Sequence, residues 1–217
     1  MTTTGPRLLL SDLDETLLGR REALRRWATA FVERRGLDEG AVEVILDEDH
    51  HGARTRRQFV DALNARFPLV PPLDLGYLAD YVRCFTLDDA TAAALRRVRL
   101  GGWRIGIATN GDQPQLDKID QVGLRALVDG IAVSALDGVR KPDPGLMRLA
   151  AQRAGASLEG AWMIGDDPVN DIQGAHAAGI RSVWLRHGRS WPQDLPPPTA
   201  MAPSFPDAVD VVLDTRP

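Results

Sequence analysis

The chain has 217 residues, of which 44% are hydrophobic and 26% charged, and its formal net charge at pH 7 is −4. This length suffices for one well-packed core with a small accessory domain, and the acidic balance argues against nucleic acid or an anionic membrane as a partner. A single cysteine excludes an intramolecular disulfide, and no run approaches the ~18 apolar residues of a membrane span. We therefore expect a soluble, cytoplasmic protein with no membrane partner.

The first predicted element is a short buried strand over residues 8–11, and the segment that follows it contains no convincing strand. Prolines at 68–75 predict a loop inside that segment. Helical periodicity is expected over residues 22–35, 42–46, 56–67 and 76–85. Residues 19–85 are therefore predicted to form a small α-helical cap domain inserted after residues 1–18.

From residue 88 onward, predicted strands and helices alternate along the chain. The strands are expected at 103–109, 130–134, 161–165 and 181–185, and the helices at 90–98, 116–122, 145–154 and 171–178. This alternation predicts an α/β core with a doubly wound parallel sheet and right-handed crossovers, formed by residues 1–18 and 86–217. The Pro-rich tail at 191–206 is expected to be irregular, and residues 210–213 to add a last strand or a short helical turn.

Polar residues follow four of the predicted strands, where ligands of open parallel sheets bind. They are Asp12 and Asp14, then Thr109 and Asn110, then Lys141, then Asp166 and Asp171. Carboxylates gathered at one point repel one another and call for a cation, and oxygen ligands of this kind suit Mg²⁺. A hydroxyl and the backbone N–H groups near residues 110–111 can bind phosphate oxygens, and a lysine can stabilise a transferring phosphoryl group.

The four clusters together resemble the motifs of the haloacid dehalogenase superfamily of phosphatases. The stretches that carry the resemblance are DLDET at 12–16, ATNGD at 108–112, VRKPDP at 139–144 and GDDPVND at 165–171. The resemblance covers roughly residues 8–18 and 86–190. It implies a helical cap that closes over the site and selects the leaving group, which is the part of the chain from which the substrate is hardest to infer.

The resemblance also implies a role for each motif residue. Asp12 would be the nucleophile and Asp14 the acid and base, with Lys141 pairing with Asp12 and the phosphate. Mg²⁺ would be ligated by Asp12, by Asp166 and by the backbone carbonyl of Asp14. Asp171 would bind the metal through water or orient its ligands.

Two further motif positions qualify this assignment. Asp167 is expected to help position the motif lysine. Glu15 occupies a position where many members of the superfamily have glycine, which makes the site more acidic.

The predicted function is hydrolysis of a small phosphorylated metabolite through an aspartyl-phosphate. Three alternatives remain open: a phosphomutase, a non-catalytic protein that binds a phosphorylated ligand, and a 2-haloacid dehalogenase. Dehalogenases of the superfamily lack the second aspartate of the first motif, so Asp14 favours phosphoryl transfer. The protein is expected to be a monomer or homodimer. Within the predicted cap, His50, His51, Arg54 or Arg56 either contacts the substrate or belongs to a solvated loop.

Overall fold

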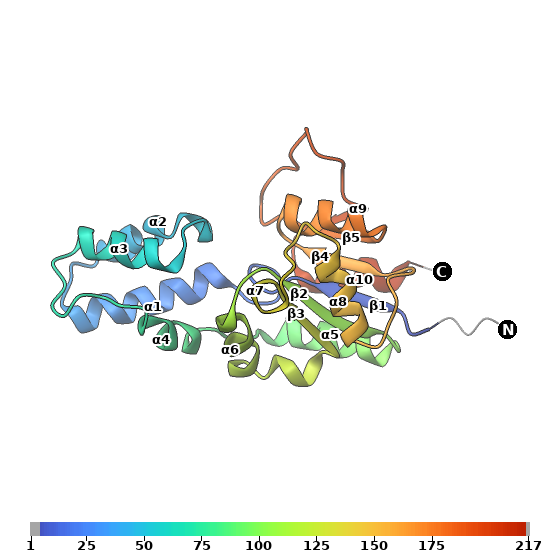
Figure 1. Cartoon of the computed structure of the whole chain (residues 1–217), viewed down its shortest axis with the longest axis horizontal. Helices are drawn as coiled ribbons and strands as arrows, with labels where there is room; N and C mark the ends of the chain where they lie inside the picture. The colour runs from blue at the N-terminus through green and yellow to red at the C-terminus, as the bar shows by residue number, and fades with distance from the viewer. Residues whose placement is uncertain (1–4, 216–217) are drawn as a thin grey trace. The chain divides into compact units, whose positions relative to one another are not determined.

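The structure, a computed structural model, describes residues 5–215 and contains a six-stranded parallel sheet in the order β3-β2-β1-β4-β5-β6 (Figure 1). The strands are β1 (Leu8–Ser11), β2 (Arg104–Thr109), β3 (Gly130–Val133), β4 (Trp162–Gly165), β5 (Arg181–Leu185) and β6 (Ala200–Ala202). Strand β1 is central, because Leu9 lies opposite Ile105 of β2 and Trp162 of β4. The predicted doubly wound α/β fold is confirmed.

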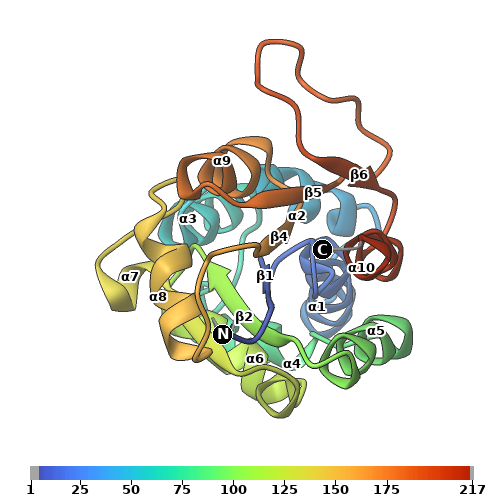
Figure 2. The same ribbon diagram turned by 90° about the vertical axis from the view of Figure 1, so that its right-hand side faces the viewer.

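Helices cover both faces of this sheet. Figure 2 shows α8 (Gly145–Arg153) and α9 (Gly174–Ala178) on one face, and α5 (Asp89–Leu100) and α10 (Phe205–Asp214) on the other. The other helical segments after residue 88 are α6 (Gln113–Gln121), η2 (Leu124–Leu127), α7 (Ser134–Asp137) and the π-helical turn η3 (Pro168–Gln173). The sheet is thereby buried on both sides, as its continuous apolar strands require.

The C-terminal tail is more ordered than its sequence predicts. Ala200–Ala202 forms β6, with Ala200 opposite Val183, inside the segment expected to be irregular. The sequence signal failed here because the strand is short, lacks β-branched residues and lies between prolines. The expected last strand or short turn is instead the full helix α10, whose N-cap residue Ser204 accepts a hydrogen bond from the backbone N–H of Asp207.

Two helix starts also differ from their predicted positions. Helix α6 begins at Gln113, three residues before the expected start, with Pro114 in its first turn. The predicted helix 171–178 is divided between η3, which begins three residues earlier at Pro168, and α9. Proline is compatible with a first turn, where backbone N–H groups have no helical partner, so it did not mark a loop in either case.

The chain divides into two compact units, Gly19–Thr86 and the remainder, Met1–Leu18 with Leu87–Pro217. We call them the helical unit and the α/β unit. The helical unit contains α1 (Arg20–Arg35), α2 (Ala41–Glu48), η1 (His50–Gly52), α3 (Arg56–Arg66) and α4 (Tyr77–Arg83). Its core includes an aromatic cluster in which Trp27 stacks on Phe31 at 5.0 Å and contacts Tyr77 at 5.1 Å.

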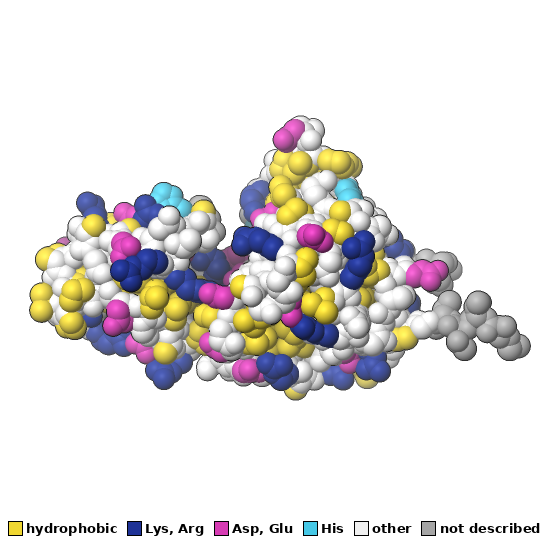
Figure 3. Space-filling model, in the orientation of Figure 1, with side chains coloured by type: hydrophobic (Ala, Val, Ile, Leu, Met, Phe, Trp, Pro, Cys, Tyr) yellow, Lys and Arg dark blue, Asp and Glu magenta, His cyan; other side chains and the backbone are white. Residues whose placement is uncertain are grey.

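The surface drawn in Figure 3 carries Lys and Arg side chains interspersed with Asp and Glu side chains on both units. Within the described part of the chain, no helix is both long enough and apolar enough to cross a membrane.

Candidate active site

The carboxyl ends of the central strands carry the predicted site residues. Asp12 follows β1, and its backbone N–H donates to the carbonyl of Ile164 in β4 over 3.0 Å, which extends the sheet pairing by one residue. Thr109 is the last residue of β2, and Asp166 follows β4 directly. The sheet therefore brings residues of the first, second and fourth motifs to one edge, as its topology requires.

Lys141 joins two of the buried carboxylates. Its Nζ donates to Asp12 Oδ1 over 2.6 Å and to Asp171 Oδ1 over 2.6 Å. All three side chains are buried. Burying any one of these charged groups alone would be strongly unfavourable. The attraction between the ammonium and the two carboxylates offsets this cost of desolvation.

Burial raises the pKa values of the acidic residues despite the lysine. The pKa of Asp12 is raised to about 7, chiefly by burial and also by the negative charges of Asp171 and Asp14. Burial, reinforced by Asp12, raises the pKa of Asp166 to about 6. Burial likewise raises the pKa of Asp171. The site therefore still has an excess of negative charge that a further cation would relieve.

Three carboxylates form an acidic group of the size that a metal ion requires. Asp12, Asp166 and Asp171 each offer one oxygen, and these oxygens lie within 4.8 Å of one another. Gly165 makes this possible, because a Cβ at that position would lie 2.3 Å from Asp171 Cγ. Hard oxygen donors of this kind fit a divalent cation such as Mg²⁺.

Asp14 lies apart from this acidic group and has its own partners on α6. Lys118 Nζ donates to both carboxylate oxygens of Asp14, over 2.8 and 2.7 Å. Gln115 Nε2 donates to Asp14 Oδ2 over 3.2 Å and to Thr109 Oγ1 over 2.8 Å. Lys118 and Gln115 were missed in the sequence analysis. The available signal was their spacing of three residues on a helix that begins directly behind the second motif.

Asn110 supports Lys141 through the backbone. Its amide nitrogen donates to the Lys141 carbonyl, and its amide oxygen accepts from the Lys141 N–H, each over 3.0 Å. The backbone N–H of Gly111, expected to be available for phosphate, already donates to Ser134 Oγ over 3.0 Å. The Gly111 N–H, one of the backbone donors expected to bind phosphate, is therefore already hydrogen-bonded within the protein.

Asp167 acts locally, as the N-cap of η3. Its carboxylate accepts from the backbone N–H groups of Val169 and Asn170, each over 2.8 Å. Among the described residues its carboxylate does not contact Lys141, but its backbone N–H donates to Asp171 Oδ2 over 3.0 Å. Asn170 Oδ1 in turn accepts from Asn110 Nδ2 over 3.3 Å. Any influence of Asp167 on the lysine therefore passes through Asp171, which pairs with Lys141, or through the two asparagines.

The loop after β5 also reaches the site. Arg189 Nη2 donates to Asp166 Oδ2 over 3.0 Å, so this carboxylate has a cationic partner of its own. His187 Nε2 lies 2.6 Å from the backbone oxygen of Glu15. Glu15 has a φ of 56°, a left-handed conformation that glycine adopts with less strain.

Several charged groups of the helical unit pair with one another. In the loop that contains the predicted substrate-contact candidates, Arg54 pairs with Glu48, and Asp49 pairs with Arg20 over 2.6 Å. His50 lies in η1 and Arg56 begins α3, while the side chain of His51 lies outside the described residues.

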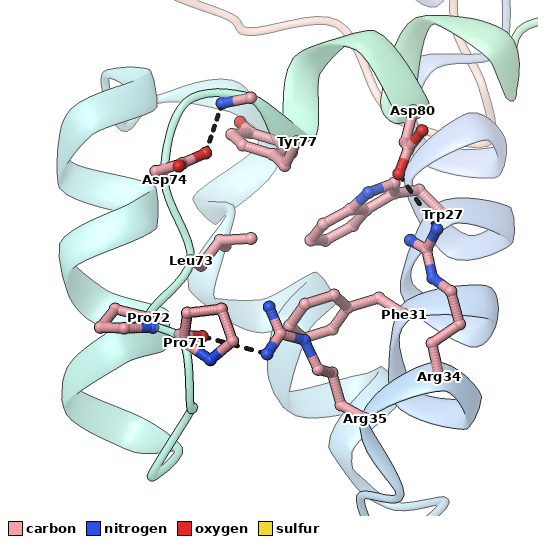
Figure 4. A pocket seen from close by; sticks show the side chains of 11 residues that line it. Trp27, Phe31, Arg34, Arg35, Pro71, Pro72, Leu73, Asp74, Tyr77 and Asp80 are labelled. Atoms are coloured by element: carbon pink, nitrogen blue, oxygen red, sulfur yellow. Dashed lines mark hydrogen bonds and ion pairs between the residues drawn. The ribbon is translucent and has the colours of Figure 1, made fainter.

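The same unit contains a cavity of about 350 Å³ (Figure 4). At its edge, Arg34 pairs with Asp80 over 3.0 Å, and Arg35 donates to the Pro71 carbonyl over 3.0 Å. Aromatic side chains contribute to its lining, namely Trp27, Phe31 and Tyr77. Each of these two guanidinium groups is thus held in place by an oxygen acceptor at the edge of the cavity.

A family model of haloacid dehalogenase-like hydrolases matches residues 6–179. The chain belongs to this family. Hydrolases of the haloacid dehalogenase family generally use a divalent metal, in agreement with the acidic group described above. The resemblance inferred from the four motifs, and the prediction that the protein is an enzyme of this superfamily, are confirmed.

Several relatives of this haloacid dehalogenase-like hydrolase are phosphatases. Phosphoserine phosphatase of Thermus thermophilus is 30% identical over 171 residues, a match that spans 77% of this chain and 59% of that one. Glyceraldehyde 3-phosphate phosphatase of Pyrococcus furiosus is 32% identical over 208 residues, which cover 87% of this chain and 84% of that one. The match thus spans less than two thirds of the Thermus relative but most of the Pyrococcus one.

Solved structures share the fold of this haloacid dehalogenase-like hydrolase at low sequence identity. A putative haloacid dehalogenase-family hydrolase from Bacillus subtilis matches with a TM-score of 0.74 and 21% identity, covering 95% of this chain and 98% of that one. L-2-haloacid dehalogenase from Xanthobacter autotrophicus matches with a TM-score of 0.73 and 15% identity, covering 97% and 100%. The fold alone therefore does not distinguish the reactions of the family.

Proposed function

We propose that this protein is a Mg²⁺-dependent phosphatase that hydrolyses a small phosphomonoester through an aspartyl-phosphate on Asp12. The observation that carries the proposal is the contact of Lys141 Nζ with Asp12 Oδ1 at 2.6 Å, beside an acidic group of metal-binding size. The phosphatases among its relatives support the same reaction class.

In the first step, Asp12 attacks phosphorus while the bond from phosphorus to the leaving oxygen breaks. The leaving oxygen takes a proton from Asp14, so an alcohol departs and the phosphoryl group remains on Asp12. Lys141 lies in contact with the nucleophile, where its positive charge stabilises the charge that develops on the transferring group. Thr109 donates its hydroxyl proton to a phosphate oxygen.

In the second step, water attacks phosphorus and the bond from phosphorus to Asp12 breaks. Asp14, now a carboxylate, takes a proton from the water, and inorganic phosphate leaves. Each residue thereby returns to its starting state. The two roles of Asp14 require its carboxylate to lie near both the leaving oxygen and the attacking water.

The residues that would hold Mg²⁺ are Asp12, Asp166 and Asp171, with the Asp14 backbone carbonyl as a further oxygen ligand. When bound, the ion would supply positive charge that neutralises the phosphate oxygens and lets an anionic nucleophile approach them. The raised pKa of Asp12, about 7, supports this assignment, because a bound cation would favour the ionised form that attacks.

The presence of Asp14 favours phosphatase over dehalogenase chemistry. Displacement of halide gives a leaving group that needs no proton, whereas an alkoxide leaving group does. The substrate is proposed to be a small phosphorylated metabolite, because the named relatives act on phosphoserine and glyceraldehyde 3-phosphate. Residues 19–85 are proposed to form the cap that selects among such compounds.

Phosphate release from a panel of phosphomonoesters, measured with Mg²⁺ and with EDTA, tests the proposal. Asp12→Asn should lower turnover by several orders of magnitude while the circular dichroism spectrum is retained. Asp120→Asn is the matched control, because this aspartate forms an exposed pair with Arg125 on the same unit. Full activity of Asp12→Asn, or activity that EDTA does not reduce, would contradict the mechanism.

A further inference from the structure

Helix α6 directs two buried polar side chains at the proposed acid and base. Gln115 is 1% exposed and Lys118 is 2% exposed, although both residue types are usually found at the surface. They are three residues apart and therefore share a face of the helix. Neither residue belongs to the four motifs. Their buried polar groups need hydrogen-bond partners within the protein to replace the lost hydrogen bonds to water.

The hydrogen bonds among these groups have a defined direction. Lys118 carries only donors, so the Gln115 atom that it contacts at 2.7 Å is the acceptor Oε1. The amide nitrogen of Gln115 consequently faces Thr109 Oγ1 and Asp14 Oδ2. Because Thr109 Oγ1 accepts this bond, its own proton is left to donate elsewhere, as binding a phosphate oxygen requires.

The backbone of the second motif is shaped around Gln115. Gly111 has a φ of 155°, and a Cβ at this position would lie 2.5 Å from Gln115 Cγ. Glycine at this position thus leaves the space that the glutamine occupies. The close fit of a loop glycine to this side chain is an observation independent of the ion pair.

We propose that Lys118 and Gln115 are positioning residues that hold the Asp14 carboxylate and the Thr109 hydroxyl in one network during departure of the leaving group. The inference rests on the proposed phosphatase function. The proton still passes from Asp14 to the leaving oxygen, and Lys118 keeps its own protons throughout. The lysine acts only through the orientation of the carboxylate.

Orientation matters because Asp14 is otherwise weakly constrained. Its side chain is 24% exposed, and both of its oxygens are held by Lys118. Loss of the two charge-assisted hydrogen bonds would let χ1 of Asp14 adopt other staggered positions. A misplacement of about 1 Å in a reacting group can cost on the order of 10²-fold in rate.

The test compares kcat/KM for two esters that differ in their need for a proton. The leaving group of glycerol phosphate is an alkoxide, which needs a proton from the acid. The leaving group of 2,4-dinitrophenyl phosphate is a stabilised phenolate, which needs none. The ratio kcat/KM reports the steps through leaving-group departure, so it excludes the later hydrolysis of the aspartyl-phosphate. Lys118→Met should lower it roughly 10²-fold for glycerol phosphate and only a few-fold for the aryl ester.

A double-mutant cycle separates positioning from a general structural effect. In an Asp14→Asn background, Lys118→Met should change kcat/KM for glycerol phosphate by less than about three-fold, because the residue through which it acts is already disabled. Arg125→Met is the matched control, since it removes an exposed ion pair with Asp120 and should leave both esters unaffected.

Equal losses for the two esters, or losses that multiply in the double mutant, would overturn the inference. If Lys118→Met does not fold by circular dichroism, Gln115→Met gives the same comparison, with a smaller but still ester-selective loss expected. A wild-type protein that releases no phosphate from any member of the phosphomonoester panel, these two esters included, with Mg²⁺ would refute the proposed function and this inference together, whereas the first two outcomes refute only the inference.

Discussion

Replacement of Lys141 by methionine should destabilise the α/β unit strongly, since the lysine bridges two buried carboxylates at 2.6 Å each. Removing one partner of a buried ion pair typically costs about 3–5 kcal/mol, because the remaining charge has no compensation. In the Lys141→Met variant, the carboxylates of Asp12 and Asp171 would both lose their compensating positive charge. For a protein of this size the loss corresponds to a fall in Tm of roughly 6–20 °C.

The cost of Lys141→Met should depend on pH. Without the lysine, the pKa values of Asp12 and Asp171 would rise further, so the folded variant would bind more protons than the unfolded chain over a wide range above the ordinary aspartate pKa of 3.8. Its stability should therefore fall as pH rises. The loss relative to wild type should be small near pH 5 and close to its full value near pH 8.

Urea unfolding at the two pH values, with EDTA and then with Mg²⁺, measures this loss. Arg104→Met is the control, because Arg104 forms a half-exposed pair with Asp129 that should contribute no more than about 1 kcal/mol. Mg²⁺ at 100 times its Kd should restore about 2.7 kcal/mol to the variant. A loss near pH 8 no larger than that of the control would refute the assignment of Lys141 as the counter-ion of the buried carboxylates.

Two further predictions concern the same α/β unit. Wild-type protein in EDTA should lose stability as pH rises from about 4 to 7, because the pKa of Asp12 is raised to about 7 and that of Asp166 to about 6, so the folded state binds more protons in this window than the unfolded chain. Thermal unfolding at several pH values measures the slope of Tm against pH, which Mg²⁺ should flatten. A Tm that rises with pH over this window would contradict the reasoning. Val212→Asp should cost about 3–5 kcal/mol in urea unfolding, because Val212 is fully buried on α10 and an unpaired charge would replace it. Asp210→Ala on the same helix removes only an exposed pair with Arg97 and should cost at most about 1 kcal/mol, so similar losses for the two variants would show that α10 does not pack as described.

The motif residues could be found from sequence because their signal is local. Asp12, Thr109 and Asp166 lie at the ends of short apolar runs, and parallel strands must end at the same edge of a sheet. Thr109 at the end of β2 and Asp166 after β4 needed only a correct assignment of strands. The roles assigned to these residues remain predictions, since geometry alone does not test them.

The partners of Asp14 could not be found in this way. Gln115 and Lys118 lie in QPQLDKIDQ, whose polar composition is typical of an exposed helix face. Only the tertiary structure turns this polar face inward, toward an aspartate about a hundred positions earlier in the chain. The last strand was missed for a related reason, because Ala200–Ala202 acquires its strand conformation by pairing with β5 and not from its own propensity.

The central place of β1 in the sheet has a consequence for biosynthesis. The ribosome produces β1 before the other strands of this sheet, yet Leu9 must wait for Ile105 and Trp162 before both of its edges are paired. At translation rates of about 5–20 residues per second, the wait for β4 lasts on the order of ten seconds. Residues Gly19–Thr86 can meanwhile collapse through contacts among themselves. The nascent chain therefore exposes the apolar run Leu8–Leu10 longer than the later strands of the sheet, and assembly of the acidic centre around Asp12 must follow the synthesis of β4.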